Sequence, residues 1–442
     1  MTRFATVIFG ATVMALAAAV PARAADLTLD DCIELALKHR AAIIAARGAE
    51  DLAKASERAA LGAFLPQASA TYEYAKTKDR DRKLEVQTDT GTIKSSLPNI
   101  DYYNKSTNIS ASIGFPLPQT LHSYLAARVD HERASLDVIA SEQDLIYAVK
   151  SSFYAYLAAV QNVSVQEEAV KRSDEQLKLI QSKFDLGSAA KSDVLKQKVQ
   201  SGNDVLSLLR ARNAVTSTMA ALAYTVGLDP RQEWSFATQY IVRQYDGSLT
   251  DAIEFGMNRR PSVLSSQKSV KASDHRLTVA KLQYLPKFSP YASYGYSKST
   301  GINPFDYSAR TSSLTSLTYG FQVSWNIFDG FAREEGFTSA RVARNNARAA
   351  LADQRNLVAS EIKTAYLDID RLKEQKKVSD ENVAAATEDL KITQEKYNLG
   401  AATILDLLNA QVSLKEAQVS SISADFDLNL AVAKLENAMG KM

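Results

Sequence analysis

Apolar and polar residues alternate along this chain with two different periods. In four short segments every second side chain is apolar: about 67–76, 106–116, 288–298 and 315–328. Between and after them, apolar residues recur at every third and fourth position over much longer stretches. A period of two predicts β-strands with one apolar face, and a period near 3.6 predicts amphipathic helices. We therefore expect a few strands combined with long helices.

Two of the helical stretches are unusually long. They run from about 120 to 186 and from about 331 to 399, and neither contains a proline. At 1.5 Å per residue, each helix would be about 100 Å long. Their apolar stripes are narrow, as in Val149, Phe153 and Tyr156, which is typical of seams between neighbouring helices in coiled coils. These helices are expected to pack against each other and not around a broad core.

The chain also repeats itself. Residues 29–66 match 249–286 at a fixed offset of 220, and residues 128–227 match 341–440 at a fixed offset of 213. Internal duplication of this length predicts two similar structural units.

The duplication divides the chain into two halves and a connection. Residues 25–227 and 249–442 each read as a helix, two strands, a very long helix, a tight turn and a returning helix, and 228–248 joins them. Gly187 and Gly400 stand at the ends of the two long helices, where a glycine can take the left-handed conformation that caps a helix.

The first 24 residues have the features of a signal peptide. A basic start and an apolar run precede Ala22-Arg23-Ala24, whose small residues suit a cleavage site, so we expect the mature chain to begin at Ala25. Removal of Arg3 and Arg23 lowers the 52 basic residues to 50, which equals the 50 acidic residues. A neutral chain is not expected to bind nucleic acid. No later stretch is apolar enough for a transmembrane helix.

No motif in the sequence is typical of an enzyme. We find no phosphate-binding loop, nucleophile elbow or paired-carboxylate motif. The four histidines and the single cysteine, Cys32, lack the spacing of metal ligands, and one cysteine excludes an intrachain disulfide. Cys32 matches Ala252 in the second half, which favours a small buried helix residue. We predict neither catalysis nor a bound metal or cofactor.

The strand faces indicate a membrane β-barrel. Alternation of apolar and polar side chains over about 9–11 residues, with several aromatic residues, is typical of outer-membrane strands. Four strands cannot close a barrel of useful size, since about eight are needed even to enclose packed side chains, so several chains must share one barrel. A periplasmic coiled-coil scaffold or binding protein with a soluble sheet is the alternative. The candidates for the membrane interface are Tyr72, Tyr74, Tyr294, Tyr296, Tyr319 and Trp325.

Taken together, these features resemble the outer-membrane efflux proteins, the TolC-like family. The resemblance rests on the paired helix openings at 29–36 and 249–254, on Leu-Pro before the first strand of each half, and on the turns KFDLG at 183–187 and KYNLG at 396–400. It covers nearly all of the mature chain. It implies an α+β membrane protein, a homotrimer whose four strands per protomer form one twelve-stranded outer-membrane barrel above a long periplasmic helical barrel.

The resemblance also implies a function. Members of this family are passive exit ducts in the outer membrane of Gram-negative bacteria. They serve tripartite efflux pumps or type I secretion systems and dock to a periplasmic adaptor and an inner-membrane pump. In the family, the turns that contain Gly187 and Gly400 form the periplasmic tip that adaptors contact. Nothing in the sequence chooses between export of small molecules and export of polypeptides.

One acidic residue has two possible roles. Asp406 falls where the family places an acidic ring that closes the periplasmic aperture, and the next acid of the family pattern is Asn409 here. However, Thr403 and Asp406 also have the spacing of a capping box, and an acid in the first helical turn favours the helix dipole. Asp193 has the same place in the first half, but Ala190 replaces the capping threonine.

Overall fold

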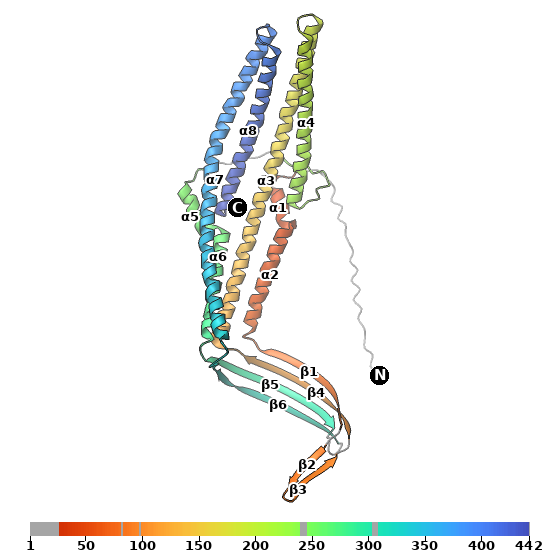
Figure 1. Ribbon diagram of the computed structural model, residues 1–442, viewed down its shortest axis with the longest axis vertical. Coiled ribbons are helices and arrows are strands. Elements are labelled where there is room, and N and C mark those ends of the chain that lie inside the picture. Colours follow the sequence, from red (N-terminus) through yellow and green to blue (C-terminus); the bar gives the residue numbers. More distant parts are fainter. Residues whose placement is uncertain (1–25, 81–82, 97–98, 239–244, 303–307, 442) are drawn as a thin grey trace.

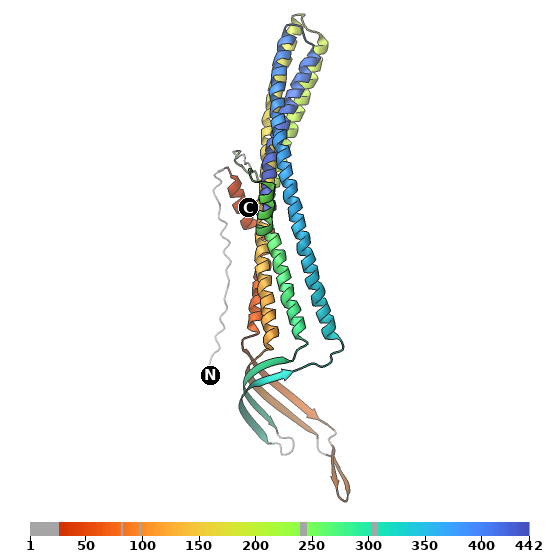
Figure 2. The same cartoon turned by 90° about the vertical axis from the view of Figure 1, so that its left-hand side faces the viewer.

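The computed structural model describes residues 26–80, 83–96, 99–238, 245–302 and 308–441. The predicted signal peptide, residues 1–24, lies outside the described residues. The molecule is elongated, with paired helices at one end and a small sheet at the other (Figure 1). Viewed from the side, the helices form one narrow column from which the sheet bends away (Figure 2).

Each half begins with helical residues, continues with strands and ends with two helices, as predicted. The two longest helices lie where the sequence predicts them. These helices, α3 and α7, contain 69 and 67 residues. The elements are α1 (Leu29–His39), α2 (Ala41–Gly62), β1 (Gln67–Asp79), β2 (Lys83–Thr88), β3 (Gly91–Ser96), β4 (Ile100–Gly114), α3 (Leu117–Asp185), α4 (Lys191–Val226), α5 (Leu249–Arg259), α6 (Pro261–Leu282), β5 (Lys287–Ile302), β6 (Ala309–Ser324), α7 (Ala332–Asn398) and α8 (Ile404–Met439).

The first helix of each half is broken in two, which differs from the single helix predicted. Arg40 separates α1 from α2, and Arg260 separates α5 from α6; both have extended backbone with ψ of 126° and 124°. In the second half Pro261 disfavours a helical conformation for the residue before it. We call these two breaks, at Arg40 and Arg260, elbows. The elbow at Arg40 packs against Gly227, which ends α4, and the elbow at Arg260 packs against Gly440, which ends α8.

The four predicted strands form one antiparallel sheet in the order β1-β4-β5-β6. The strands extend further than predicted at the end of the sheet far from the helices. The mainly polar residues there continue the antiparallel pairing, as far as Asp79 opposite Ile100 and Ile302 opposite Ala309. At the other end β6 stops at Ser324 and not near 328, because Ser324 pairs with Lys287, the first residue of β5, and no strand continues beside it. The predicted loop between β1 and β4 also contains a hairpin that the sequence analysis missed, β2 paired with β3.

The register gathers the apolar side chains on one face of the sheet. Ile109 of β4 lies opposite Tyr296 of β5, and Tyr294 lies opposite Leu317 of β6. Directly opposite residues of antiparallel strands point to the same face, so the serines and threonines between them gather on the other. The predicted division into an apolar and a polar face is therefore confirmed.

Two similar apolar clusters hold the helices together. The first contains Val149 and Phe153 of α3 together with Phe426 of α8, and the second contains Ile362 and Ile369 of α7. Cys32 lies fully buried in the first cluster, as predicted, and burial followed by the charge of Asp31 raises the pKa of its thiol to about 12. The thiol is therefore protonated and unreactive at neutral pH.

The connection between the halves packs against the first cluster. Phe236 is buried beside Tyr156, with ring centroids 5.4 Å apart, and its backbone forms a parallel bridge with Leu27. Residues 239–244 of this connection lie outside the described part of the chain. None of the helices that the structure describes is both long and apolar enough to cross a membrane.

Candidate functional site

Both long helices end far from the sheet in the same glycine turn. Gly187 has a φ of 76° and Gly400 a φ of 77°. The backbone N–H of Ser188 donates to the carbonyl of Lys183 at 2.8 Å, and the equivalent bond closes α7 at 2.8 Å. This is the Schellman arrangement, in which a left-handed residue reverses the chain and satisfies the last carbonyls of the helix. The predicted capping role of both glycines is confirmed.

The same two turns expose apolar side chains. Leu186 is 83% exposed and Leu399 is 85% exposed, each directly before its glycine. An exposed leucine alone is common on a protein surface. Two of them at equivalent places on the two helical tips, however, form a repeated apolar feature.

Asp406 caps helix α8. Its carboxylate accepts hydrogen bonds from the backbone N–H of Thr403 at 2.8 Å and from the Thr403 hydroxyl at 2.7 Å. The backbone N–H of Asp406 donates in return to Thr403 Oγ1 at 3.3 Å. The hydrogen bond from the Thr403 side chain, followed by that from its backbone, lowers the pKa of Asp406. Asp406 and Asn409 are both exposed and lie one turn apart on the same side of α8.

Asp193 has no capping partner at the matching position of α4. The helix begins after Ala190, whose methyl side chain cannot accept a hydrogen bond. Asp193 instead lies close to Tyr397 at the end of α7: burial, and then the charge of Asp193, raise the pKa of the Tyr397 phenol. The two tips of one protomer are thus in electrostatic contact.

Lys183 links the two tips, and the sequence analysis did not predict this contact. Its Nζ lies 4.8 Å from the centre of the Tyr397 ring and donates to Asn398 Oδ1 at 3.2 Å. A cation over an aromatic face contributes about 0.5–1 kcal/mol at an exposed site. These residues and Asp193 line a cleft of about 460 Å³ between the hairpins α3–α4 and α7–α8. The recurrence of lysine at 183 and 396 signalled the turn but not this contact.

At the opposite end, the predicted interface aromatics lie on or beside the apolar face of the sheet. Tyr72 and Tyr74 of β1, Tyr294 of β5 and Tyr319 of β6 are exposed in the protomer, and Tyr296 is half-buried. Trp325 directly follows β6, at the helical end of the sheet, where its indole N–H donates to the carbonyl of Tyr284 at 3.3 Å. The sheet therefore presents a broad aromatic and apolar surface that its own protomer leaves uncovered.

Comparison with known proteins identifies this arrangement. The sequence model of the family described as "Outer membrane efflux protein" matches residues 32–228 and 256–441. The chain belongs to this family. It is 22% identical to the outer membrane efflux protein BepC of Brucella suis biovar 1 (strain 1330), over 94% of this chain and 86% of BepC. It is also 22% identical to the alkaline protease secretion protein AprF of Pseudomonas aeruginosa, over 98% of this chain and 88% of AprF.

The solved structures agree on the fold. The outer membrane channel CmeC of Campylobacter jejuni matches with a TM-score of 0.78 at 15% sequence identity, over 93% of this chain and 85% of CmeC. The fold class predicted from the sequence, that of the TolC-like outer-membrane channels, is confirmed. This outer membrane efflux protein is thus an outer-membrane exit duct with a large periplasmic helical part, of the kind that serves tripartite pumps and type I secretion.

The two helical hairpins of this efflux protein use different ion pairs at equivalent positions. Glu167 of α3 pairs with Arg212 of α4 at 2.9 Å. At an offset of 213, the same positions in α7 and α8 are occupied by two acids, Asp380 and Asp425. Lys376, one turn before Asp380, contacts both, at 2.7 Å and 3.2 Å. One lysine therefore lies between two carboxylates that would otherwise face each other without a cation.

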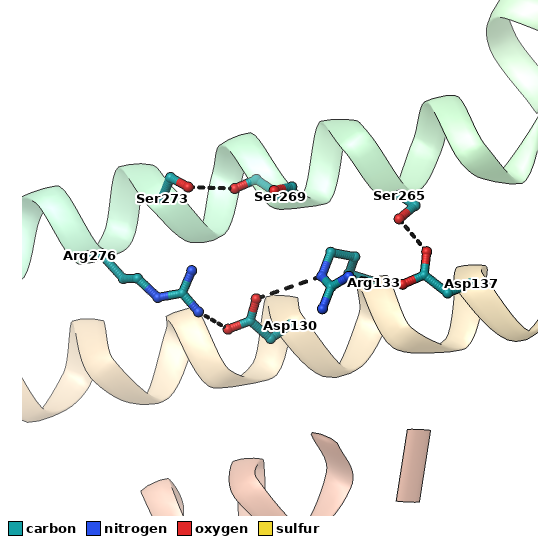
Figure 3. A network of polar contacts seen from close by, with 7 residues as sticks. All are labelled: Asp130, Arg133, Asp137, Ser265, Ser269, Ser273 and Arg276. Carbon is teal, nitrogen blue, oxygen red and sulfur yellow. Dashed lines mark hydrogen bonds and ion pairs between the residues drawn. The ribbon is translucent and has the colours of Figure 1, made fainter. Parts of the chain in front are cut away.

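The contact between α3 and α6 is a polar seam (Figure 3). Arg276 of α6 pairs with Asp130 of α3, Arg133 lies 4.0 Å from Asp130 and 2.9 Å from Asp137, and Asp137 accepts a hydrogen bond from Ser265 at 2.5 Å. Exposed ion pairs each contribute about 0–1 kcal/mol, so this seam fixes the alignment of the helices more than it stabilises them.

The structure brings together two histidines whose contact the sequence did not reveal. His122 of α3 and His275 of α6 lie 3.2 Å apart at their Nδ1 atoms. Within the described ranges, no group of three or more histidine, cysteine, aspartate or glutamate side chains is arranged to hold a metal ion.

Proposed function

We propose that this protein acts as a homotrimer whose protomers share one twelve-stranded barrel. In the described sheet, β1 and β6 are the edge strands, with 13 and 16 residues. An open edge cannot lie in the hydrocarbon of a membrane, because its backbone groups would lack hydrogen-bond partners. Four antiparallel strands per copy let β6 of one protomer pair antiparallel with β1 of the next. Three copies then enclose an open lumen, as in the family.

The aromatic face is proposed to define the membrane-spanning band. Eight residues of β5 separate Phe288, near Trp325, from Tyr296, which corresponds to about 27 Å along a strand. At a strand tilt of about 40° this length spans a height of about 21 Å, which falls within the apolar band of about 25 Å that outer-membrane barrels expose. In this placement Trp325 marks the periplasmic rim, Tyr74 and Tyr296 the outer rim, and Tyr319 faces lipid between them.

The exposed tip leucines are proposed to contact the periplasmic adaptor, and the duct itself to perform no chemistry on its cargo. Replacing Leu186 and Leu399 together with aspartate is expected to abolish export while the trimer still assembles, because both side chains are almost fully exposed. Export in a strain that lacks the native duct measures the effect. Leu→Ala at both positions is the milder control. Full export by the aspartate variant would exclude adaptor docking through these leucines.

Asp406 is proposed to line the closed periplasmic aperture in addition to capping α8. Three symmetry copies of an exposed carboxylate near one axis would attract cations and narrow the path. We expect purified wild-type trimer in planar bilayers to give a small, cation-preferring current that increases in Asp406→Ala. Asn409→Asp, which adds a second acid one turn along the same side of α8, should increase the cation preference.

Matched variants separate the aperture role from the cap. Thr403→Val removes the hydroxyl of the capping box but keeps the Asp406 carboxylate. If current rises equally in Thr403→Val and Asp406→Ala, the effect comes from the cap and the aperture proposal is wrong. Absence of current from every variant, combined with a monomeric native mass, would instead favour the periplasmic scaffold.

A further inference from the structure

Two imidazole rings converge on the α3–α6 seam. Nδ1 of His122, in the second turn of α3, lies 3.2 Å from Nδ1 of His275 in α6. Both side chains are half-buried, and their ring centroids lie 5.5 Å apart at an angle of 39°. The two nitrogen atoms thus face each other across two separate helices.

We propose that His122 and His275 form a binding site for a divalent ion such as Zn²⁺, which joins α3 to α6. Imidazole nitrogens bind Zn²⁺ at about 2.0–2.1 Å, so two on one ion lie about 2.9 Å apart at a right angle and about 3.4 Å apart in a tetrahedron. The observed 3.2 Å falls between these limits. The separation of the two nitrogens therefore suits one ion, and each ring must turn so that its lone pair points at the ion and not at the other nitrogen.

The protonation of the pair is compatible with metal binding. Without an ion, one neutral ring donates its Nδ1–H to Nδ1 of the other. When an ion binds, that proton moves to Nε2 of the same ring, and both Nδ1 lone pairs face the metal. Burial, followed by the charges of His122 and Lys271, lowers the pKa of His275, while Asp274 opposes this shift. A metal ion binds the neutral form of both rings.

A buried acceptor with no partner in the described part of the chain lies on the same helix as His122. Gln119, one helical turn before His122, is 8% exposed, and its Nε2 donates to the carbonyl of Leu282 on α6 at 3.1 Å. Its Oε1 is buried and has no hydrogen-bond partner among the described residues. Water would complete the coordination of the ion, without a third protein ligand.

The site would add a further link to a seam that also contains exposed ion pairs. Arg276 and Asp130 make such a pair beside it, and pairs of this kind contribute little in water. His122 lies only five residues after the start of α3, close to the point where the helices meet the sheet. A bound ion would fix α3 against α6 at this junction and would be distinct from any transported cargo.

Calorimetric titration of Zn²⁺ into the full-length trimer in detergent, without a polyhistidine tag, tests the proposal. We expect one ion per protomer, and a loss of affinity of more than about tenfold in His122→Gln and in His275→Gln, since removing even an outer-shell partner causes such a loss. His131→Gln is the matched control, because His131 lies on the same helix but pairs with Glu57 at 2.7 Å. Unchanged affinity in both glutamine variants would overturn the proposal.

A second measurement on the unaltered protein covers the case in which a variant does not assemble. Diethyl pyrocarbonate modifies free imidazoles, and mass spectrometry locates the modified residues. Zn²⁺ should protect His122 and His275 together and leave His39 reactive, since that side chain lies exposed at the end of α1. Equal modification of the pair with and without Zn²⁺ would contradict the site.

Discussion

Replacing Lys376 with methionine is expected to destabilise the α7–α8 hairpin by more than about 1 kcal/mol. The Lys376 side chain is 26% exposed and its Nζ contacts Asp380 and Asp425. Burial alone would lower its pKa, but hydrogen bonds to both carboxylates raise it. Without the lysine, two facing acids lose their shared cation. The cost should remain below the about 3–5 kcal/mol of a fully buried broken pair, because water still reaches the site.

The first half of the chain suggests a rescue of this variant. Arg212 occupies the position equivalent to Asp425 and pairs with Glu167. Adding Asp425→Arg to Lys376→Met should therefore restore an ion pair with Asp380 and most of the lost thermal stability. Thermal unfolding of the trimer in detergent, followed by loss of heat-modifiable migration, measures both steps. An unrestored midpoint in the double variant would show that the acids do not face each other.

The same comparison has a pH dependence. The hydrogen bond from Lys376 is the main reason that the pKa of Asp380 is lowered in the folded protein. Because the pKa of Asp380 is lower in the folded protein than in the unfolded chain, ionised Asp380 stabilises the fold above the unfolded pKa of about 3.9. This stabilisation is lost as the pH falls through the pKa of Asp380 in the folded protein. The difference in melting temperature between wild type and Lys376→Met should therefore be full at neutral pH and shrink as the pH falls below about 4.

Gly440→Ala is expected to destabilise the protein far more than Gly400→Ala, although both glycines are left-handed helix caps. Their φ angles are 72° and 77°, so each alanine would incur a left-handed penalty of about 1–2 kcal/mol. A Cβ at Gly440 would also lie 2.8 Å from the Cα of Arg260, a backbone atom that cannot move aside cheaply. Crowding of this kind adds about 1–3 kcal/mol.

Gly400 provides the control because no described atom lies within 4 Å of a Cβ placed there. The difference between the two melting temperatures isolates the contact between the end of α8 and the α5–α6 elbow. Equal melting temperatures for the two variants would mean that the elbow does not pack on Gly440 as described.

Local patterns predicted most of the fold. The periods of the apolar residues located the four sheet strands and both long helices, because one face of each element is buried or lies against membrane. The Thr403–Asp406 spacing predicted a cap that the structure confirms, since capping depends on neighbours three residues apart. The β2–β3 hairpin escaped because each of its strands is only six residues long and the pair carries just three apolar residues, Leu84, Val86 and Ile93, within a polar stretch that reads as a loop.

Contacts between distant helices could not be predicted in this way. Lys183 and Asn398 are 215 residues apart, and His122 and His275 are 153 apart. Whether such side chains meet depends on how each long helix is rotated about its axis and how far it slides along its neighbour. Small changes in either would separate them, and no local spacing encodes these two quantities.

The two open edges of the sheet have a genetic consequence. If every barrel closes only where β6 of one copy pairs with β1 of the next, one copy with a damaged edge strand prevents the whole trimer from closing its barrel. A cell that makes normal and damaged chains in equal amounts, with random mixing, would assemble only about one intact trimer in eight. Mutations in β1 or β6 that spare insertion should therefore act as dominant alleles, whereas mutations that prevent a chain from joining should be recessive.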